Sequence, residues 1–398
     1  MKKTYKVIIG MTFCMSVFVG CGDDEPIVDT QEQLKQEVME TYANIVYASY
    51  VDSYNEAVKL QTAITAFLAE PSSTTKFEAA KQAWLDSREP YLQTEAYRFA
   101  SGPIDDEDGP EGFLNAWPLD EAYIDYVEGN STAGIINDPN SFPTISKDVL
   151  ESLNEQGGEE NISIGYHAIE FLLWGQDLTD PSAKMPGQRP NTDFVDQGTA
   201  SNQDRRRKYM EVCASLLLDH LQLMVDEWNP DNSGNYRETF LALNSSTALK
   251  NILTGIGVLS KSELAGERIF TAYDNRDQED EHSCFSDNTH RDTRQDAQGV
   301  KNVYLGSYTR VDDTVVSGKG LHDLMEELNP ELATSILAQL NLAFDKVDAV
   351  GIPFDNAIND DTERPKIIEA VNELRTLGDN FAAVATVLGF NINTGLPD

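Results

Sequence analysis

The chain has 398 residues, of which 30 are lysine or arginine and 67 are aspartate or glutamate, so its formal net charge at pH 7 is −37. Nucleic-acid binding needs a basic surface that neutralises phosphates, and the one basic run, residues 205–208, is too small to provide it. The composition therefore argues against nucleic acid as a partner. Strong acidity keeps a protein soluble at a crowded surface, and it also attracts cations.

Residues 1–20 have the pattern of an export signal. Three lysines precede an apolar run, residues 7–19, that is too short for a permanent membrane span. The run ends at Cys21 in a sequence that resembles a bacterial lipobox, where the cysteine is cut free and acylated. Residues 22–25 resemble the acidic tag that sends some Bacteroidetes lipoproteins to the outer surface of the outer membrane. We expect an exported protein that contacts the membrane through a lipid on Cys21; a secreted protein cleaved nearby is the alternative.

Helical periodicity runs through most of the remaining chain, which predicts an all-α fold. The apolar spacing predicts long helices at residues 32–69 and 77–100, with an interruption or kink of the second at Pro90, and a shorter helix at 119–127. A turn-rich stretch follows, and then a weaker helix signal at residues 147–155.

Residues 178–201 are rich in proline and glycine, and we place a domain boundary there because the chain is longer than one core usually holds. Beyond it, helices are predicted at residues 204–228, within 236–272, and at 331–350 and 362–388, while residues 278–320 read as polar and irregular. Long helix pairs in each half predict two tandem helical bundles, each resembling a four-helix bundle, with an old duplication as one possible origin. The predicted organisation is a signal peptide at residues 1–20, a lipid-anchored linker at 21–31, an N-terminal bundle at 32–200 and a C-terminal bundle at 201–398.

Residues 161–177 predict a short helix with almost no polar face, capped by Asn161 or Ser163. Such a helix is buried. His167 and Glu170 are three residues apart and therefore on the same side of it, so an imidazole and a carboxylate point to one place in the interior. Burying ionisable groups costs free energy unless they find partners. The pair is either part of a ligand or metal site or a buried hydrogen-bonded pair that ties the bundles together.

A stripe of polar and aromatic side chains lies where core is expected. Spacings of three and four residues place five side chains on one side of a regular helix, namely Trp84, Arg88, Tyr91, Glu95 and Arg98. The alternative is a ladder of ion pairs at the bundle surface, with Leu85 and Phe99 beside it on the true core face. Glu263 and Glu267, just before Arg268, likewise share one predicted face, which by itself is ordinary helix surface.

Residues 278–292 are dense in groups that could bind a hard or borderline cation. The donors are Glu279, Asp280, Glu281, His282, Asp287, His290 and Asp292. A solvated loop in which Asp287 or Asn288 caps a helix explains the same residues.

Residues 163–176 contain the pattern Gly-x-His-x-x-Glu and resemble the signature segment of the imelysin family. Residues 266–268 followed by 278–290 resemble the iron-regulated protein A branch of that family, and residues 88–99 resemble its matching first-half segment. The three matches occur in the same order across most of the chain. The resemblance implies two helical bundles with the signature helix near their junction, and an association with bacterial iron uptake.

From the residues and the resemblance together, we expect a cleft between bundles that binds iron or a small anionic, iron-carrying ligand. The expected site residues are His167, Glu170, Glu95, Arg88, Arg98, His282 and Asp287, with Tyr91, Glu267, Arg268, Ser286 and His290 as secondary candidates. The arginines fit an anionic ligand, such as chelated iron, better than a bare cation. Iron or another divalent metal is the expected cofactor, and an outer-membrane uptake machinery is the expected partner.

Two other functions stay open. The family also carries a peptidase label, because its signature was thought to bind a metal. A zincin needs His-Glu-x-x-His, whereas here Ala168 follows the single histidine, so His167 and Glu170 would need a third ligand from elsewhere, such as His282. Enzymatic activity is therefore the less favoured expectation. The last alternative is a structural or interaction lipoprotein in which His167 and Glu170 only bind each other.

Overall fold

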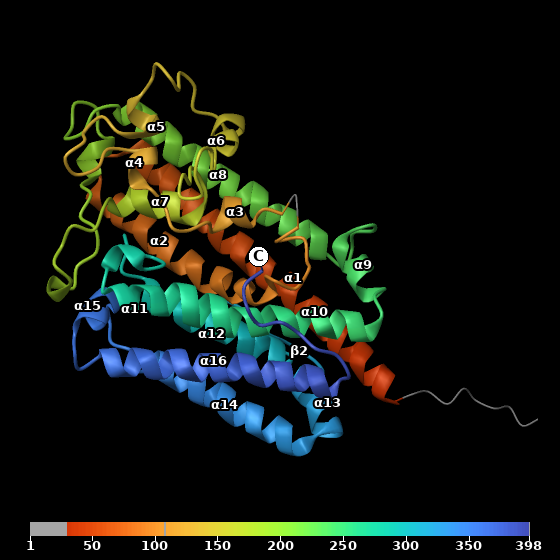
Figure 1. Ribbon diagram of the computed structural model, residues 1–398. Coiled ribbons are helices and arrows are strands. Elements are labelled where there is room, and N and C mark those ends of the chain that lie inside the picture. Colours follow the sequence, from red (N-terminus) through yellow and green to blue (C-terminus); the bar gives the residue numbers. More distant parts are fainter. Residues whose placement is uncertain (1–29, 107–108, 398) are drawn as a thin grey trace, which may run out of the picture.

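The computed structural model describes residues 30–106 and 109–397, and this part of the chain is helical almost throughout (Figure 1). The predicted signal peptide, Cys21 and nearly all of the predicted linker at 21–31 lie outside the described residues. Within the described part, no helix combines the length and the apolar character needed to cross a membrane. The all-α prediction is confirmed.

In chain order the α-helices are α1 (Thr30–Ala69), α2 (Thr74–Gln93), α3 (Glu111–Leu114), α4 (Glu121–Ile124), α5 (Gly134–Asn137), α6 (Lys147–Leu153), α7 (Gly165–Trp174), α8 (Gln203–Trp228), α9 (Tyr236–Leu241), α10 (Ser245–Val258), α11 (Thr271–Asn275), α12 (Thr289–Leu305), α13 (Leu321–Leu328), α14 (Pro330–Asp348), α15 (Phe354–Asn359) and α16 (Arg364–Val387). Short 3-10 helices are η1 (Thr94–Tyr97), η2 (Pro181–Ala183), η3 (Asn191–Phe194) and η5 (Gln278–Asp280), whereas η4 (Leu259–Phe270) is a π-helix between α10 and α11. Two short strands, β1 (Ser307–Thr309) and β2 (Val315–Ser317), pair antiparallel with Tyr308 opposite Val316.

Helix α1 is the central helix of a group that also contains α2 and α8. Its buried side chains, such as Val38, Ile45 and Leu60, follow the helical period, and α2 and α8 pack on them (Figure 1). Burial of each such aliphatic side chain stabilises the fold by about 1.5–3 kcal/mol. Helix α8 begins just beyond the boundary predicted between residues 200 and 201, yet its main partners are α1 and α7. The tandem arrangement of two bundles is therefore not confirmed.

Helix α12 lies between the group formed by α1, α2 and α8 and the group formed by η4, α14 and α16. It packs on α2 on one side and on α14 and η4 on the other, while α16 packs on η4, α14 and α10 (Figure 1). The prediction that residues 278–320 are irregular is therefore wrong over the 17 residues of α12. Its polar residues turn inward, where distant arginines meet them.

The signature segment forms α7, and every residue of this helix is buried, as predicted. The predicted cap is wrong, because Ile164 precedes the helix and supplies no side-chain cap. The hydroxyl of Ser163 instead donates a hydrogen bond to the backbone oxygen of Leu150 at 2.7 Å. Tyr209 of α8 donates to the backbone oxygen of Ser163 at 2.7 Å. The start of α7 is thus positioned by its neighbours rather than by its own side chains.

The loop predicted at residues 178–201 is anchored by buried ion pairs. Arg189 donates to Asp125 at 2.5 Å, and Arg206 at the start of α8 donates to both carboxylate oxygens of Asp125 at 2.7 Å. The side chains of all three residues are 1% exposed or less. The two arginines therefore share the one carboxylate of Asp125 inside the fold, which ties the loop to the start of α8.

Candidate functional site

His167 and Glu170 face each other in the interior. His167 Nδ1 lies 2.8 Å from Glu170 Oε2, and Glu170 Oε1 accepts hydrogen bonds from the backbone nitrogen and the hydroxyl of Ser286 at 3.0 and 2.6 Å. Burial lowers the pKa of His167 well below its usual value, and the charge of Arg88 lowers it further. Burial also raises the pKa of Glu170 to about 8. His167 is therefore a neutral imidazole at pH 7.

A second buried imidazole, that of His282, lies against the first. The ring centroids of His167 and His282 are 4.8 Å apart, with an angle of 72° between the planes. His282 Nδ1 lies 2.7 Å from Asp292 Oδ2, which also accepts the hydroxyl of Ser283 at 2.5 Å. Burial lowers the pKa of His282 to about 3, and the charge of Arg268 acts in the same direction.

The two histidines share one arrangement. Each Nδ1 contacts a buried acidic group. Asp292 stays ionised because Arg88 outweighs burial and lowers its pKa, so His282 Nδ1 carries the ring proton and Nε2 is the position for a ligand. Glu170, with a pKa of about 8, is mostly protonated at pH 7, so a metal on His167 Nε2 would require Glu170 to lose its proton and accept Nδ1–H. Among the described residues, His167 Nε2 has no hydrogen-bond partner, and His282 Nε2 has Asn115 Nδ2 at 3.5 Å. A carboxylate on the far nitrogen is the usual support of a metal-binding histidine, because it fixes the tautomer and the ring orientation.

A network of buried charges surrounds the histidines. Arg88 donates to Asp292 at 3.1 Å and to Asn115 at 2.6 Å, and Asn115 donates to Glu95 at 3.4 Å. Glu95 in turn accepts a hydrogen bond from Arg268 at 2.5 Å. These residues come from α2, η1, α12, η4 and the turn after α3. The structure brings five of the predicted site residues together, His167, Glu170, Arg88, Glu95 and His282, along with two secondary candidates, Arg268 and Ser286.

Glu95 gives a pH-dependent prediction. Burial raises its pKa, but Arg268 and Arg98 outweigh burial and hold the pKa at about 2. Because the unfolded chain titrates near the ordinary value, Glu95 stabilises the fold above pH 4.5 and loses this contribution as the pH falls toward 2. Glu95→Gln is expected to remove about 3 kcal/mol at pH 7 and progressively less on acidification. Denaturant unfolding of both proteins at pH 7, 4 and 3 measures this loss in the free energy of unfolding.

The exposed Glu267 supplies the matched control, since Glu267→Gln makes the same chemical change on η4. This variant is expected to unfold like the parent protein at each pH. If the free energy of unfolding of Glu95→Gln falls on acidification as steeply as that of the parent, the low pKa assigned to Glu95 does not contribute to stability.

Glu263 and Glu267 both lie in the π-helix η4. Glu263 pairs with Arg268, five residues further along this π-helix, at 3.0 Å. Glu267 is exposed, whereas the side chain of Glu263 is partly buried against Arg268. Within η4 the backbone hydrogen bonds follow the π-helical pattern, from residue i to i+5, rather than the α-helical one.

The other candidates lie around the network or outside it. Arg98 follows the end of η1, and its guanidinium binds Glu95 and Glu111 at 3.2 and 3.1 Å. The ring of Tyr91 is fully buried with the Arg88 guanidinium 5.6 Å from its centroid, so the predicted stripe is interior rather than surface. His290 Nδ1 lies 3.0 Å from the backbone oxygen of Asp287, and the carboxylate of Asp287 joins a different cluster.

A polar pocket of about 390 Å³ opens beside the network. Its charged lining consists of Arg98, Arg268, Glu111, Glu155, Glu159 and Glu263, with His282 at its inner side. Both arginines already bind carboxylates, so the lining carries an excess of negative charge. Burial raises the pKa of Glu111 to about 7. Arg88, which we expected to meet an anionic ligand, is fully buried and is absent from this lining. The pocket therefore favours a cation.

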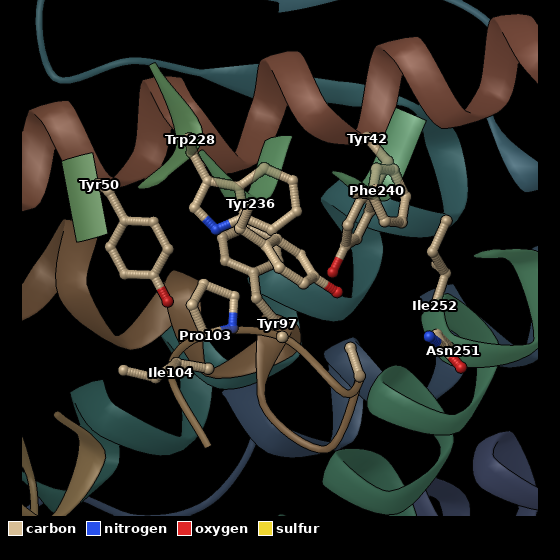
Figure 2. Close-up of a pocket in the computed structure, with 12 residues that line it drawn as sticks. Tyr42, Tyr50, Tyr97, Pro103, Ile104, Trp228, Tyr236, Phe240, Asn251 and Ile252 are labelled. Atoms are coloured by element: carbon tan, nitrogen blue, oxygen red, sulfur yellow. The ribbon is translucent and has the colours of Figure 1, made fainter. Parts of the chain in front are cut away.

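A smaller aromatic cavity lies between α1, α8 and the chain after η1. Figure 2 shows the rings of Tyr42, Tyr97 and Trp228 around it. Its volume is about 10 Å³, close to the space that one water molecule needs. It has no buried acid or histidine in its lining, so it is not a candidate for metal or chelate binding.

Sequence reasoning missed Asn115 as the residue that joins Arg88, Glu95 and His282. It also left Asp292 outside the expected site and did not consider Asp296, which accepts a hydrogen bond from Arg268 at 3.0 Å. The aspartates are four residues apart, so a helical interpretation of this segment would have placed them on one face. Asn115 gives no comparable signal, because it lies alone in a turn.

The glycine of the signature has a backbone role. Gly165 begins α7 with φ +90°, and a Cβ atom there would lie 2.8 Å from the backbone oxygen of Leu114. Gly165→Ala is expected to lower the free energy of unfolding by about 2–3 kcal/mol, through backbone strain and this clash. Gly234→Ala is the matched control, because Gly234 has φ +75° and a Cβ atom there would meet no other atom within 4 Å. Thermal and denaturant unfolding should show a larger loss for Gly165→Ala; equal losses would contradict the clash.

The sequence and the fold were compared with those of known proteins and solved structures. The family model described as Imelysin (Peptidase M75) matches residues 46–381. Iron-regulated protein A of Synechococcus elongatus is 24% identical over 379 residues, covering 93% of this chain and 90% of the relative. The crystal structure of an iron-regulated protein A precursor from Parabacteroides distasonis has a TM-score of 0.70 at 20% identity, covering 89% of this chain and 95% of that chain. An imelysin-like protein from Psychrobacter arcticus has a TM-score of 0.64 at 12% identity, covering 92% and 98%.

Proposed function

The chain belongs to the imelysin family, and from this premise we propose that it is a lipoprotein of bacterial iron uptake that binds iron as a cation at His167 and His282. The iron is cargo, held until it is passed on. An iron-related role agrees with the name of the Synechococcus relative, iron-regulated protein A.

The observation that carries the proposal is the pair of buried imidazoles. Both rings are neutral at pH 7, their centroids are 4.8 Å apart, and Glu170 and Asp292 each contact one Nδ1. Imidazole nitrogen and carboxylate oxygen are donors that iron accepts. His167 and His282 would supply the nitrogen ligands. The acidic residues of the pocket would offer oxygen ligands on the side of His282, which lines the pocket, whereas His167 lies behind it against the His282 ring.

The ligand class we favour is the iron ion itself rather than an anionic chelate. Arg268 is occupied by Glu95 and Asp296, and Arg98 by Glu95 and Glu111. Neither guanidinium is left to neutralise an incoming anion. The surplus of glutamates attracts a positively charged ion toward His282.

We keep the predicted location as part of the proposal. Export and a lipid on Cys21 would place the pocket at the outer surface of the outer membrane, where iron is captured. The partner would be the outer-membrane uptake machinery, and the membrane itself would be contacted through the lipid alone.

Titration of the purified protein with Fe²⁺ under anaerobic conditions tests the proposal. Calorimetry is expected to show saturable binding of one Fe²⁺ and no binding of ferric citrate, which serves as the anionic chelate. Incubation with unfolded casein is expected to leave the casein intact. Absence of saturable Fe²⁺ binding would refute the proposal, and cleavage of casein that stops on adding a chelator would favour a metallopeptidase instead.

A further inference from the structure

Three carboxylates from distant parts of the chain meet at a second buried place. Asp177 follows α7, Asp287 precedes α12, and Asp355 lies in α15. One carboxylate oxygen of each lies within 4.8 Å of the corresponding oxygens of the other two. Asp177 is 3% exposed, Asp287 7% and Asp355 1%. The cluster is thus built by the tertiary fold and not by a local run of acidic residues.

The cluster contains oxygens that nothing in the described structure satisfies. Neither carboxylate oxygen of Asp355 has a hydrogen-bond partner among the described residues, and the same holds for Oδ2 of Asp177. The other oxygen of Asp177 accepts the backbone nitrogen of Thr179 at 3.0 Å. Buried carboxylates are normally hydrogen-bonded or paired with a positive charge, because water is no longer there to solvate them. These oxygens are therefore available to a ligand.

The electrostatics of the cluster agree with this. Burial raises the pKa of Asp287 to about 8, and the charge of Asp355 adds to the effect. Burial likewise raises the pKa of Asp355 to about 6. Glu281, which is 1% exposed, has its pKa raised well above the usual value by burial and by the charges of the three aspartates. Four acids that repel one another gain from a cation placed between them.

We propose that Asp177, Asp287 and Asp355, with Glu281 beside them, bind a Ca²⁺ ion. The donors are all carboxylate oxygens, which a hard cation prefers. Ca²⁺ accepts six to eight oxygens in a flexible geometry, and aspartates from three separate segments suit it better than they suit the strict octahedron of Mg²⁺. The triad itself contains no nitrogen or sulfur donor, which sets it apart from the histidine site.

The ion would connect segments that also shape the histidine site. Ser286, next to Asp287, donates the two hydrogen bonds that hold Glu170. Gln278 donates to the backbone oxygen of Asp177 at 2.7 Å, so both sides of the cluster touch the loop that carries His282. Ca²⁺ would therefore fix the end of α7, this loop and α15 to one another.

Calorimetry and thermal unfolding of the EDTA-treated protein test the proposal, with CaCl₂ as the added ligand. One Ca²⁺ is expected to bind, and at a hundredfold excess over Kd the Tm should rise by about 3 °C. Asp355→Asn and Asp177→Asn should each weaken Ca²⁺ binding at least about tenfold, because each removes one charged ligand. Asp274→Asn is the matched control: it removes an exposed aspartate of α11 and should bind Ca²⁺ like the parent.

The Tm in the absence of Ca²⁺ shows whether an aspartate variant is folded, so that a loss of Ca²⁺ binding can be told apart from a loss of folding. Asparagine keeps the size of aspartate and removes a repelled charge, so Asp355→Asn is expected to unfold in EDTA at pH 8 at a Tm equal to or above that of the parent. His167→Ala should bind Ca²⁺ like the parent, which separates this site from the iron site. Lack of any Ca²⁺ effect on the parent, or unchanged Ca²⁺ affinity in both aspartate variants, would overturn the proposal.

Discussion

His167→Ala is expected to weaken binding of Fe²⁺ by about 100-fold or more while the protein stays folded, because the variant removes one of two proposed nitrogen ligands. Glu170→Gln should weaken binding by about 10- to 100-fold, since it removes the carboxylate that orients His167 Nδ1 and leaves the ligand itself in place. Anaerobic calorimetry with Fe²⁺ measures both affinities. The order of the two losses distinguishes a ligand from the residue that positions it.

His322→Ala provides the control for removal of a histidine. His322 in α13 lies 3.4 Å from Glu326, so it also forms an imidazole–carboxylate pair. It is not among the residues that line the pocket. Its Fe²⁺ affinity should equal that of the parent. If His167→Ala lowers the Tm but binds Fe²⁺ like the parent, His167 and Glu170 are a structural pair, and the iron proposal fails at this site.

Apolar periodicity was enough to predict α1, α7, the burial of His167 and most of α2. The helix predicted at residues 77–100 ends at Gln93, where η1 follows, and Pro90 lies inside α2 rather than interrupting it. The same periodicity failed for α12, because the buried face of that helix carries Asp292 and Asp296, which a pattern of hydrophobicity reads as exposed. Their partners, Arg88 and Arg268, come from α2 and η4, and Arg88 is 204 residues away from Asp292. No local pattern contains that information. The histidine pair was foreseeable in type, since both histidines stand in the segments that resemble the family, but their contact depends on the fold.

The cluster of Asp177, Asp287 and Asp355 could be predicted from the sequence even less than the histidine pair. Asp287 stands in a stretch that is visibly rich in donors, so a cation there was one of the sequence-based interpretations. Asp177 stands at the end of the predicted helix 161–177 and Asp355 in a segment with no donor pattern, and their distance from Asp287 in the sequence hides the relation. The sequence predicted Asp287 beside His167, whereas its carboxylate lies with the other two aspartates. The backbone at Asp287, with φ +57°, turns its neighbours Ser286 and Asn288 toward separate partners, Glu170 and Asp292.

Removal of the Asp292 carboxylate is expected to have the largest effect on stability. Asp292 is the shared acceptor of Arg88, His282 and Ser283, and Asn288 donates to its other oxygen at 3.0 Å. Asp292→Ala would leave the guanidinium of Arg88, which is fully buried, without its counter-charge. Breaking a buried ion pair in this way costs about 3–5 kcal/mol. Denaturant unfolding at pH 7 should show this loss in the free energy of unfolding.

The double variant Arg88→Met with Asp292→Leu tests whether the loss comes from the orphaned charge. Replacing both partners by apolar side chains removes the uncompensated charge along with the pair, so the double variant should be more stable than Asp292→Ala by about 1–3 kcal/mol. If the double variant is instead less stable than Asp292→Ala, the network stabilises the protein through its hydrogen bonds to His282 and Ser283. The pair would then be kept for the orientation of His282, and Fe²⁺ affinity of the double variant should fall with it.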